Sequence, residues 1–122
     1  MEDTNAIREI LSKYYSQLSK GDEWQPFLSE NIVLTGTVAK ETRGKDAYVN
    51  NTFFKLIRGL KVKKMIVERD SACALVNYDL VSPKGKSFIC DVSEIWSIKG
   101  GKLTLSLFIL IPEPSTISCH SE

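Results

Sequence analysis

Glu94 is the residue best placed to do chemistry, because the surrounding sequence predicts a carboxylate on an apolar strand face. Residues that share its parity are apolar: Phe88, Cys90, Val92, Trp96 and Ile98. Side chains of one parity share one face of a strand, so this carboxylate would be buried if that face is the inner one. Burial would raise its pKa and would require a hydrogen-bond donor such as the Tyr14 hydroxyl. The alternative is that a β-bulge shifts the parity and turns Glu94 to water.

Tyr14 is the second candidate, and it has two interpretations. It lies in the apolar stripe of the first predicted helix, where a tyrosine commonly packs in the core and satisfies one hydroxyl hydrogen bond. It can equally direct that hydroxyl toward a ligand. Phe88 and Trp96 share the ambiguity, since aromatic residues at strand spacing line either a cavity or a core.

Other residue types common in active sites are scarce. His120 is the sole histidine and lies in the polar C-terminal segment, which argues against a histidine-centred triad or a multi-histidine metal site. Cys73, Cys90 and Cys119 are odd in number and far apart, and no CxxC spacing occurs. This pattern is typical of reduced thiols in the cytoplasm. No secretory signal pattern precedes them. We therefore expect a cytoplasmic protein with no metal and no cofactor.

Apolar periodicity predicts the elements that position these candidates. Steps of three and four residues predict a helix over 4–20, a short helix within 22–29, and a third helical pattern that Gly59 ends. A first strand begins at Ile32. From Leu60 onward a period of two predicts strands over 62–70, 72–81, 86–98 and 102–111. Helices gathered on one side of an antiparallel sheet make an α+β domain over residues 1–111, followed by a tail over 112–122.

Composition sets further bounds on function. The 122 residues are 43% apolar and 25% charged, with a net charge of +1, as in an ordinary soluble domain. Nucleic acid is not expected as a partner, because phosphate binding needs a concentrated basic surface. A membrane-spanning helix is not expected either, because the apolar stretch over 103–111 is too short to cross a bilayer.

Four local strings resemble the nuclear transport factor 2-like superfamily, which includes ketosteroid isomerases and polyketide cyclases. They are YYSQLSKGD at 14–22, FLSENIV at 27–33, GKDA at 44–47 and EIWSIKGGKL at 94–103. The resemblance covers about residues 7–111. It implies a cone-shaped, cystatin-like fold in which three N-terminal helices pack on a curved antiparallel sheet with a pocket between them.

The resemblance also implies roles for three positions. Members similar to ketosteroid isomerase use a helix tyrosine and a protonated strand acid as an oxyanion hole, and these fall on Tyr14 and Glu94. Their aspartate base falls on Thr35. A threonine hydroxyl cannot take a proton from a carbon acid at neutral pH, so steroid-type isomerisation is disfavoured.

Three functions are consistent with this sequence. The first is a protein that binds a small, mainly apolar ligand with residues of the predicted pocket: Tyr14, Thr35, Phe54, Phe88, Val92, Glu94 and Trp96. The second is a cyclase, isomerase or hydrolase of a small ring-containing metabolite, with Glu94 as general acid or base and Tyr14 stabilising negative charge. The third is an interaction module whose pocket is filled by its own side chains.

The last strand predicts a partner for the sheet. Its one face carries Leu103, Leu105, Leu107, Ile109 and Ile111, and its other face carries Phe108 and Leu110. An antiparallel sheet normally leaves one face wet, so a second apolar face predicts a homodimer through the outer sheet face. Asp91 is expected on that outer face.

Overall fold

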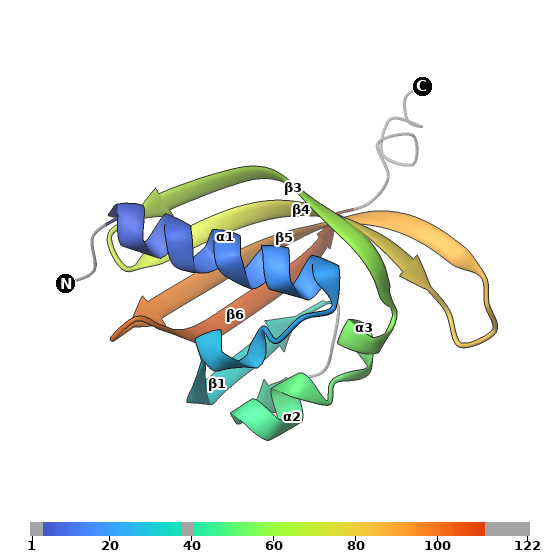
Figure 1. Ribbon diagram of the computed structural model, residues 1–122, viewed down its shortest axis with the longest axis horizontal. Helices are drawn as coiled ribbons and strands as arrows, with labels where there is room; N and C mark the ends of the chain where they lie inside the picture. Colours follow the sequence, from blue (N-terminus) through green and yellow to red (C-terminus); the bar gives the residue numbers. More distant parts are fainter. Residues whose placement is uncertain (1–3, 38–40, 112–122) are drawn as a thin grey trace.

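The computed structural model describes residues 4–37 and 41–111, and the predicted tail over 112–122 lies outside them. In chain order the elements are α1 (Thr4–Lys20), the short 3₁₀ turn η1 (Gln25–Phe27), β1 (Leu28–Gly36), β2 (Thr42–Arg43), α2 (Lys45–Val49), α3 (Thr52–Lys55), β3 (Ile57–Glu68), β4 (Ser71–Val81), β5 (Ser87–Lys99) and β6 (Lys102–Ile111) (Figure 1). The strands form one sheet in the order β2-β1-β6-β5-β4-β3. The predicted α+β class is confirmed.

Helix α1 forms where the sequence predicts it and buries one stripe against the sheet. The buried residues are Ile7, Leu11, Tyr14, Tyr15 and Leu18. Gly21 ends the helix in the left-handed conformation, with a φ of 75°. Its N–H donates to the carbonyl of Leu18, and the N–H of Asp22 donates to the carbonyl of Gln17. Both bonds satisfy carbonyls that the helix end leaves without partners.

The short helices differ from the prediction. The segment 22–29 contains only η1, and β1 already begins at Leu28. The third helical pattern divides into α2 and α3, because the Asn51 side chain accepts a hydrogen bond from the backbone N–H of Phe53 and starts a new helix. Gly59 lies inside β3 and ends no helix. Helices this short depend on tertiary packing, which periodicity alone does not reveal.

The sheet is mixed, which corrects the prediction of a wholly antiparallel one. Strand β1 runs parallel to β6, whereas every other neighbouring pair is antiparallel. The two parallel strands approach closely at Gly36, which has a φ of 128°. A Cβ at Gly36 would lie 1.9 Å from the Phe108 carbonyl oxygen, so only glycine fits there.

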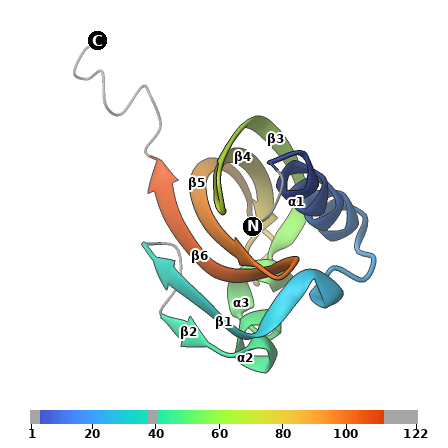
Figure 2. The ribbon, with the colours of Figure 1, turned by 90° about the vertical axis from the view of Figure 1, so that its left-hand side faces the viewer.

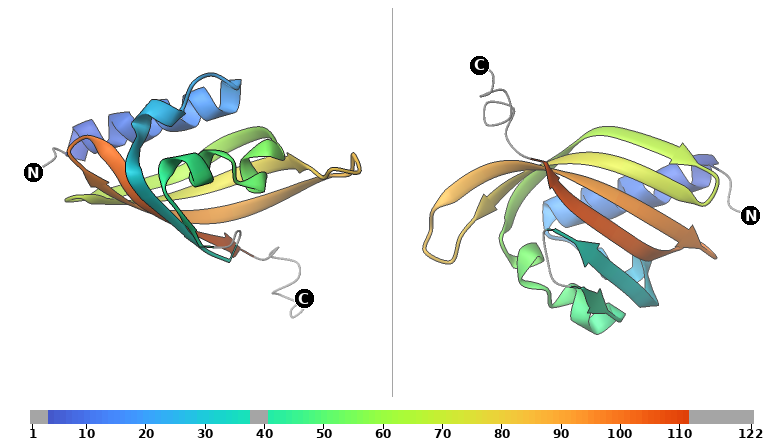
Figure 3. Two further views of the ribbon diagram at one scale, coloured as in Figure 1. Left: turned by 90° about the horizontal axis from the view of Figure 1, so that it is seen from below. Right: turned by 180° about the vertical axis from the view of Figure 1, so that it is seen from behind.

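Strands β3 to β6 curve around the side on which α1 lies (Figure 2). The opposite, outer face of the sheet carries no helix (right panel of Figure 3).

A register shift between Ser97 and Ile98 pairs Ile98 with Leu103 and Ser97 with Leu105. Leu103 is therefore buried inside while Leu105 is exposed, so these two leucines do not share one face as the simple alternation predicts.

Candidate functional site

Glu94 lies on the inner face of β5 and is fully buried, so the alternation of its strand places it correctly. Its cross-strand neighbours are Ala74 on β4 and Phe108 on β6. A carboxyl group removed from water in this way needs hydrogen-bond partners nearby.

Two tyrosines supply those partners, and a tryptophan donates to one of the tyrosines. The Tyr15 hydroxyl donates to Glu94 Oε1 at 2.5 Å, and the Tyr78 hydroxyl donates to Glu94 Oε2. Trp96 Nε1 donates in turn to the Tyr15 hydroxyl at 2.9 Å. We call Tyr15, Tyr78, Glu94 and Trp96 the carboxyl cluster. Desolvation by burial outweighs the two tyrosine hydrogen bonds and raises the pKa of Glu94 to about 8.

The structure does not join Tyr14 to Glu94 by a hydrogen bond, which corrects the predicted pairing. The Tyr14 hydroxyl instead lies 3.2 Å from the hydroxyl of Tyr48, on α2. Ser106 Oγ donates to the same Tyr48 oxygen at 3.4 Å. Burial raises the pKa of Tyr14 well above its ordinary value. Tyr14 is thus a satisfied core residue, the structural interpretation that its helical stripe allows.

Sequence reasoning missed Tyr15 and Tyr78 as partners of Glu94. A signal for Tyr78 exists, because it shares parity with the buried Ala74 and Val76 on β4. Both tyrosines have a pKa raised well above the ordinary value, chiefly by desolvation. No such signal separates Tyr15 from Tyr14, since both belong to the same buried stripe of α1.

Aromatic rings fill the interior beneath the helices. Trp24 lies 5.0 Å from Phe54 and 5.9 Å from Tyr14 between ring centroids. Phe108 lies 5.7 Å from Trp96. Contacts of this kind continue through the centre, so Tyr14, Phe54 and Trp96 are core residues rather than exposed pocket walls.

A cavity of about 210 Å³ lies at the open end of the inner sheet face. It is lined by Thr37, Phe53, Leu56, Leu80, Phe88, Cys90, Val92 and Leu110, and we call it the mouth cavity. Beyond it the β4–β5 hairpin extends past α3 (Figure 1). Phe88 and Leu110 keep 43% and 47% of their surface exposed, although their cross-strand partners Leu80 and Val92 are buried inner-face residues.

The mouth cavity contains two of the predicted ligand-binding residues, Phe88 and Val92. Glu94 lines neither this cavity nor two others described by the structure. Thr35 pairs with Leu107, while the preceding Leu34 is the buried, inward-facing residue, so Thr35 points to the outer face. Thr37, two residues later, lines the mouth cavity in its place.

Residues 4–37 and 41–111 contain no group of three His, Cys, Asp or Glu side chains that could hold a metal ion. In the same ranges, no helix is both long and apolar enough to cross a membrane.

No protein-family model matches the chain, and no curated protein is significantly similar to it. Structural similarity is extensive. A nuclear transport factor 2-like protein of unknown function from Cytophaga hutchinsonii has a TM-score of 0.71 at 20% identity, covering 89% of this chain and 93% of that one. A protein classed as a SnoaL-like polyketide cyclase from Jannaschia sp. has a TM-score of 0.75 at 10% identity, covering 99% and 98%.

A de novo designed protein with a curved β-sheet is also similar, with a TM-score of 0.70 at 17% identity over 98% of this chain and 97% of that one. A designed sequence can thus adopt this shape, so the shape alone does not specify an activity. At sequence identities this low, structural similarity establishes the fold alone, and function must be argued from the residues of the site. The chain has the nuclear transport factor 2-like fold.

Proposed function

We propose that this protein binds a small, mainly apolar molecule in the mouth cavity. The observation that carries the proposal is the lining itself, which is apolar except for the Thr37 hydroxyl and the Cys90 thiol. Ligand sites in proteins combine apolar walls with a few polar groups in this way. An engineered apolar cavity of about 150 Å³ holds benzene. At about 210 Å³ the mouth cavity suits a ligand built on one or two rings.

Binding is favoured over catalysis because the mouth cavity has no carboxylate or imidazole in its lining. Glu94, the acid that an enzyme of this kind would use, is 0% exposed. Its two oxygens already accept hydrogen bonds from Tyr15 and Tyr78. The free thiol of Cys73 fits the cytoplasmic location that we propose for the protein.

Indole is a suitable probe of the mouth cavity, and Leu110→Glu is expected to weaken its binding about tenfold or more. Leu110 is exposed enough to tolerate the change, yet it lines the cavity, where the new carboxylate would lose hydration when the ligand enters. Amide chemical-shift changes at Val92 and Cys90 during an indole titration measure the effect.

Ile109→Glu is the matched control, since Ile109 neighbours Leu110 but lies on the outer face opposite Ser93. It is expected to leave the indole titration unchanged. Equal indole affinity in wild type and Leu110→Glu would refute the mouth cavity as the ligand site.

We also propose that the outer sheet face binds a second copy of this chain. Five exposed residues form what we call the outer patch: Ile66, Ile89, Ile95, Leu105 and Ile109. They lie on strands whose outer face no helix covers (Figure 3). Asp91 lies on the same face, and its carboxylate already accepts hydrogen bonds from Lys63 and Asn77 of its own chain, so its charge is compensated beside the patch. A two-fold pair would bury the same apolar patch on both copies.

Ile109→Glu is expected to convert the dimer to a monomer, because pairing would bury two unpartnered carboxylates. Light scattering coupled to size exclusion at micromolar concentration measures the mass. Leu110→Glu, on the inner face, should remain a dimer. A monomeric wild type under these conditions would rule out the dimer.

A further inference from the structure

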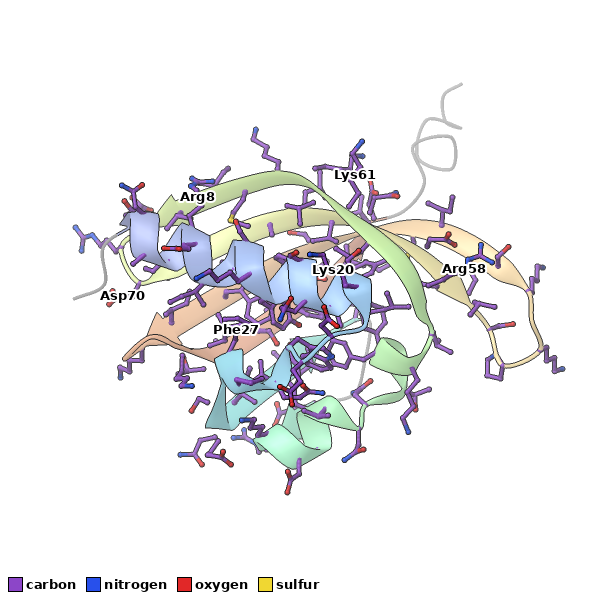
Figure 4. The ribbon with its side chains drawn as sticks, viewed as in Figure 1. Arg8, Lys20, Phe27, Arg58, Lys61 and Asp70 are labelled. Atoms are coloured by element: carbon purple, nitrogen blue, oxygen red, sulfur yellow. The ribbon has the colours of Figure 1, made fainter. Side chains whose placement is uncertain are left out.

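A second cavity, of about 410 Å³, lies between α1 and β3. Its walls are Arg8, Ser12, Tyr15 and Ser16 from α1 and Leu60, Val62 and Met65 from β3, and we call it the α1–β3 cleft. Figure 4 places Arg8 between these two elements. It shares no lining residue with the mouth cavity and has its own chemical character.

The helix wall results from a simple spacing. Arg8, Ser12 and Ser16 follow one another at four-residue steps, so they lie in one row along α1. This row lies beside the buried stripe that contains Leu11 and Tyr15. A leucine at either serine position would extend that stripe over β3, whereas serine leaves the space open and adds a hydroxyl group.

The strand wall depends on an irregularity in β3. The pairing of β3 with β4 shifts register between Val62 and Lys64. The shift places Met65 opposite the inward-facing Ala74, although its parity differs from that of Val62. Leu60, Val62 and Met65 therefore make one continuous apolar wall and remain only half-buried.

Arg8 gives the cleft a cationic end. Its Nη1 donates to the Met65 backbone oxygen at 3.2 Å, which holds the guanidinium against the strand wall. Among the described residues this is its one hydrogen bond, and no carboxylate there forms an ion pair with it. The remaining N–H groups of its planar fork can bind the oxygens of a carboxylate.

We propose that the α1–β3 cleft binds a small amphipathic carboxylate. The apolar part of the ligand lies on Leu60, Val62 and Met65. The carboxylate accepts hydrogen bonds from the Arg8 guanidinium, and Ser12 and Ser16 of α1 line the cleft beside the ligand. This site is independent of the mouth cavity, so either proposal can hold without the other.

Tyr15 connects the cleft to the interior and provides a readout. Its ring lines the cleft, while its hydroxyl accepts from Trp96 and donates to Glu94. A ligand against this ring changes the surroundings of the buried Trp96 indole through a single intervening side chain. Intrinsic tryptophan fluorescence is therefore expected to respond to occupation of the cleft.

The test is a fluorescence titration with octanoate, compared with the uncharged octanol. Wild type is expected to bind octanoate more tightly than octanol. Arg8→Gln is expected to weaken octanoate binding about tenfold or more and to leave octanol binding unchanged, because only the carboxylate uses the charged donors.

Ser16→Leu is expected to abolish octanoate binding by filling the cleft. Ser19→Leu is its matched control, since Ser19 lies on the same helix, is exposed and does not line the cleft. Leucine favours helix more than serine does, so both variants should fold. Octanoate binding that survives Ser16→Leu, or that does not occur in wild type, would overturn the proposal. Equal losses in both serine variants would also overturn it.

Discussion

Between pH 4.5 and about 8, wild type is expected to lose about 1 kcal/mol of unfolding free energy per pH unit relative to Glu94→Gln. Burial raises the pKa of Glu94 in the folded protein, so the unfolded chain releases this proton first as the pH rises. The folded state then binds more protons than the unfolded state, and stability falls through this window. The stability that the protonated Glu94 carboxyl group gives the folded state is fully present below pH 4.5 and is lost as the pH rises to about 8.

Glutamine is a suitable replacement because its amide keeps the shape of the neutral acid. Its oxygen can accept from Tyr15 and its N–H₂ group can donate to the Tyr78 hydroxyl. Urea unfolding followed by circular dichroism across the pH window measures the difference. Glu9→Gln, at a glutamate whose side chain is 66% exposed, serves as the control and should follow wild type. Parallel curves for wild type and Glu94→Gln would show that the Glu94 carboxyl group ionises in the folded protein as it does in water.

Gly36→Ala is expected to destabilise the protein by about 3 kcal/mol or more. The new Cβ would lie 1.9 Å from the Phe108 carbonyl oxygen, and a φ of 128° is unfavourable for alanine. Neither atom belongs to a flexible side chain, so β1 must move away from β6. That movement would also break the hydrogen bond of 2.9 Å from the Thr37 N–H to the same oxygen.

Gly21→Ala is the matched control for Gly36→Ala, because it introduces the backbone strain of a positive φ without a steric clash. Gly21 also has a positive φ, of 75°, but nothing lies within 4 Å of the position of its Cβ. Its replacement is expected to cost about 1 kcal/mol, the penalty for a left-handed alanine. Equal midpoints in urea for the two variants would show that the parallel strands can separate at little cost.

The sequence predicts regular elements well because their patterns are local. The stripe from Ile7 to Leu18 predicts α1, and alternation in β5 places Glu94 inside. The bulge that turns Leu105 outward has no equally clear signal, since it depends on how β6 pairs with β5. The prediction of antiparallel pairing is likewise wrong for β1, because β1 pairs in parallel with β6, a strand distant in the sequence.

The candidate site is harder to predict because it depends on choices between neighbouring residues. Tyr14 and Tyr15 are both buried, and only the packing of α1 on the sheet decides which hydroxyl reaches Glu94. Thr35 and Thr37 share parity, but the strand ends between them at Gly36. Beyond that glycine the parity rule no longer applies, and Thr37 lines the mouth cavity.

The parallel pairing of β1 with β6 has a consequence for synthesis on the ribosome. Strands β3 to β6 are successive neighbours in the sheet, so each can pair with the strand made just before it. Strand β1 emerges early, yet its long partner is the last described strand to be made. Leu34 must therefore remain without its β6 neighbour, Ser106, through most of translation. The nascent chain is expected to acquire protease resistance late, only after β6 has left the exit tunnel.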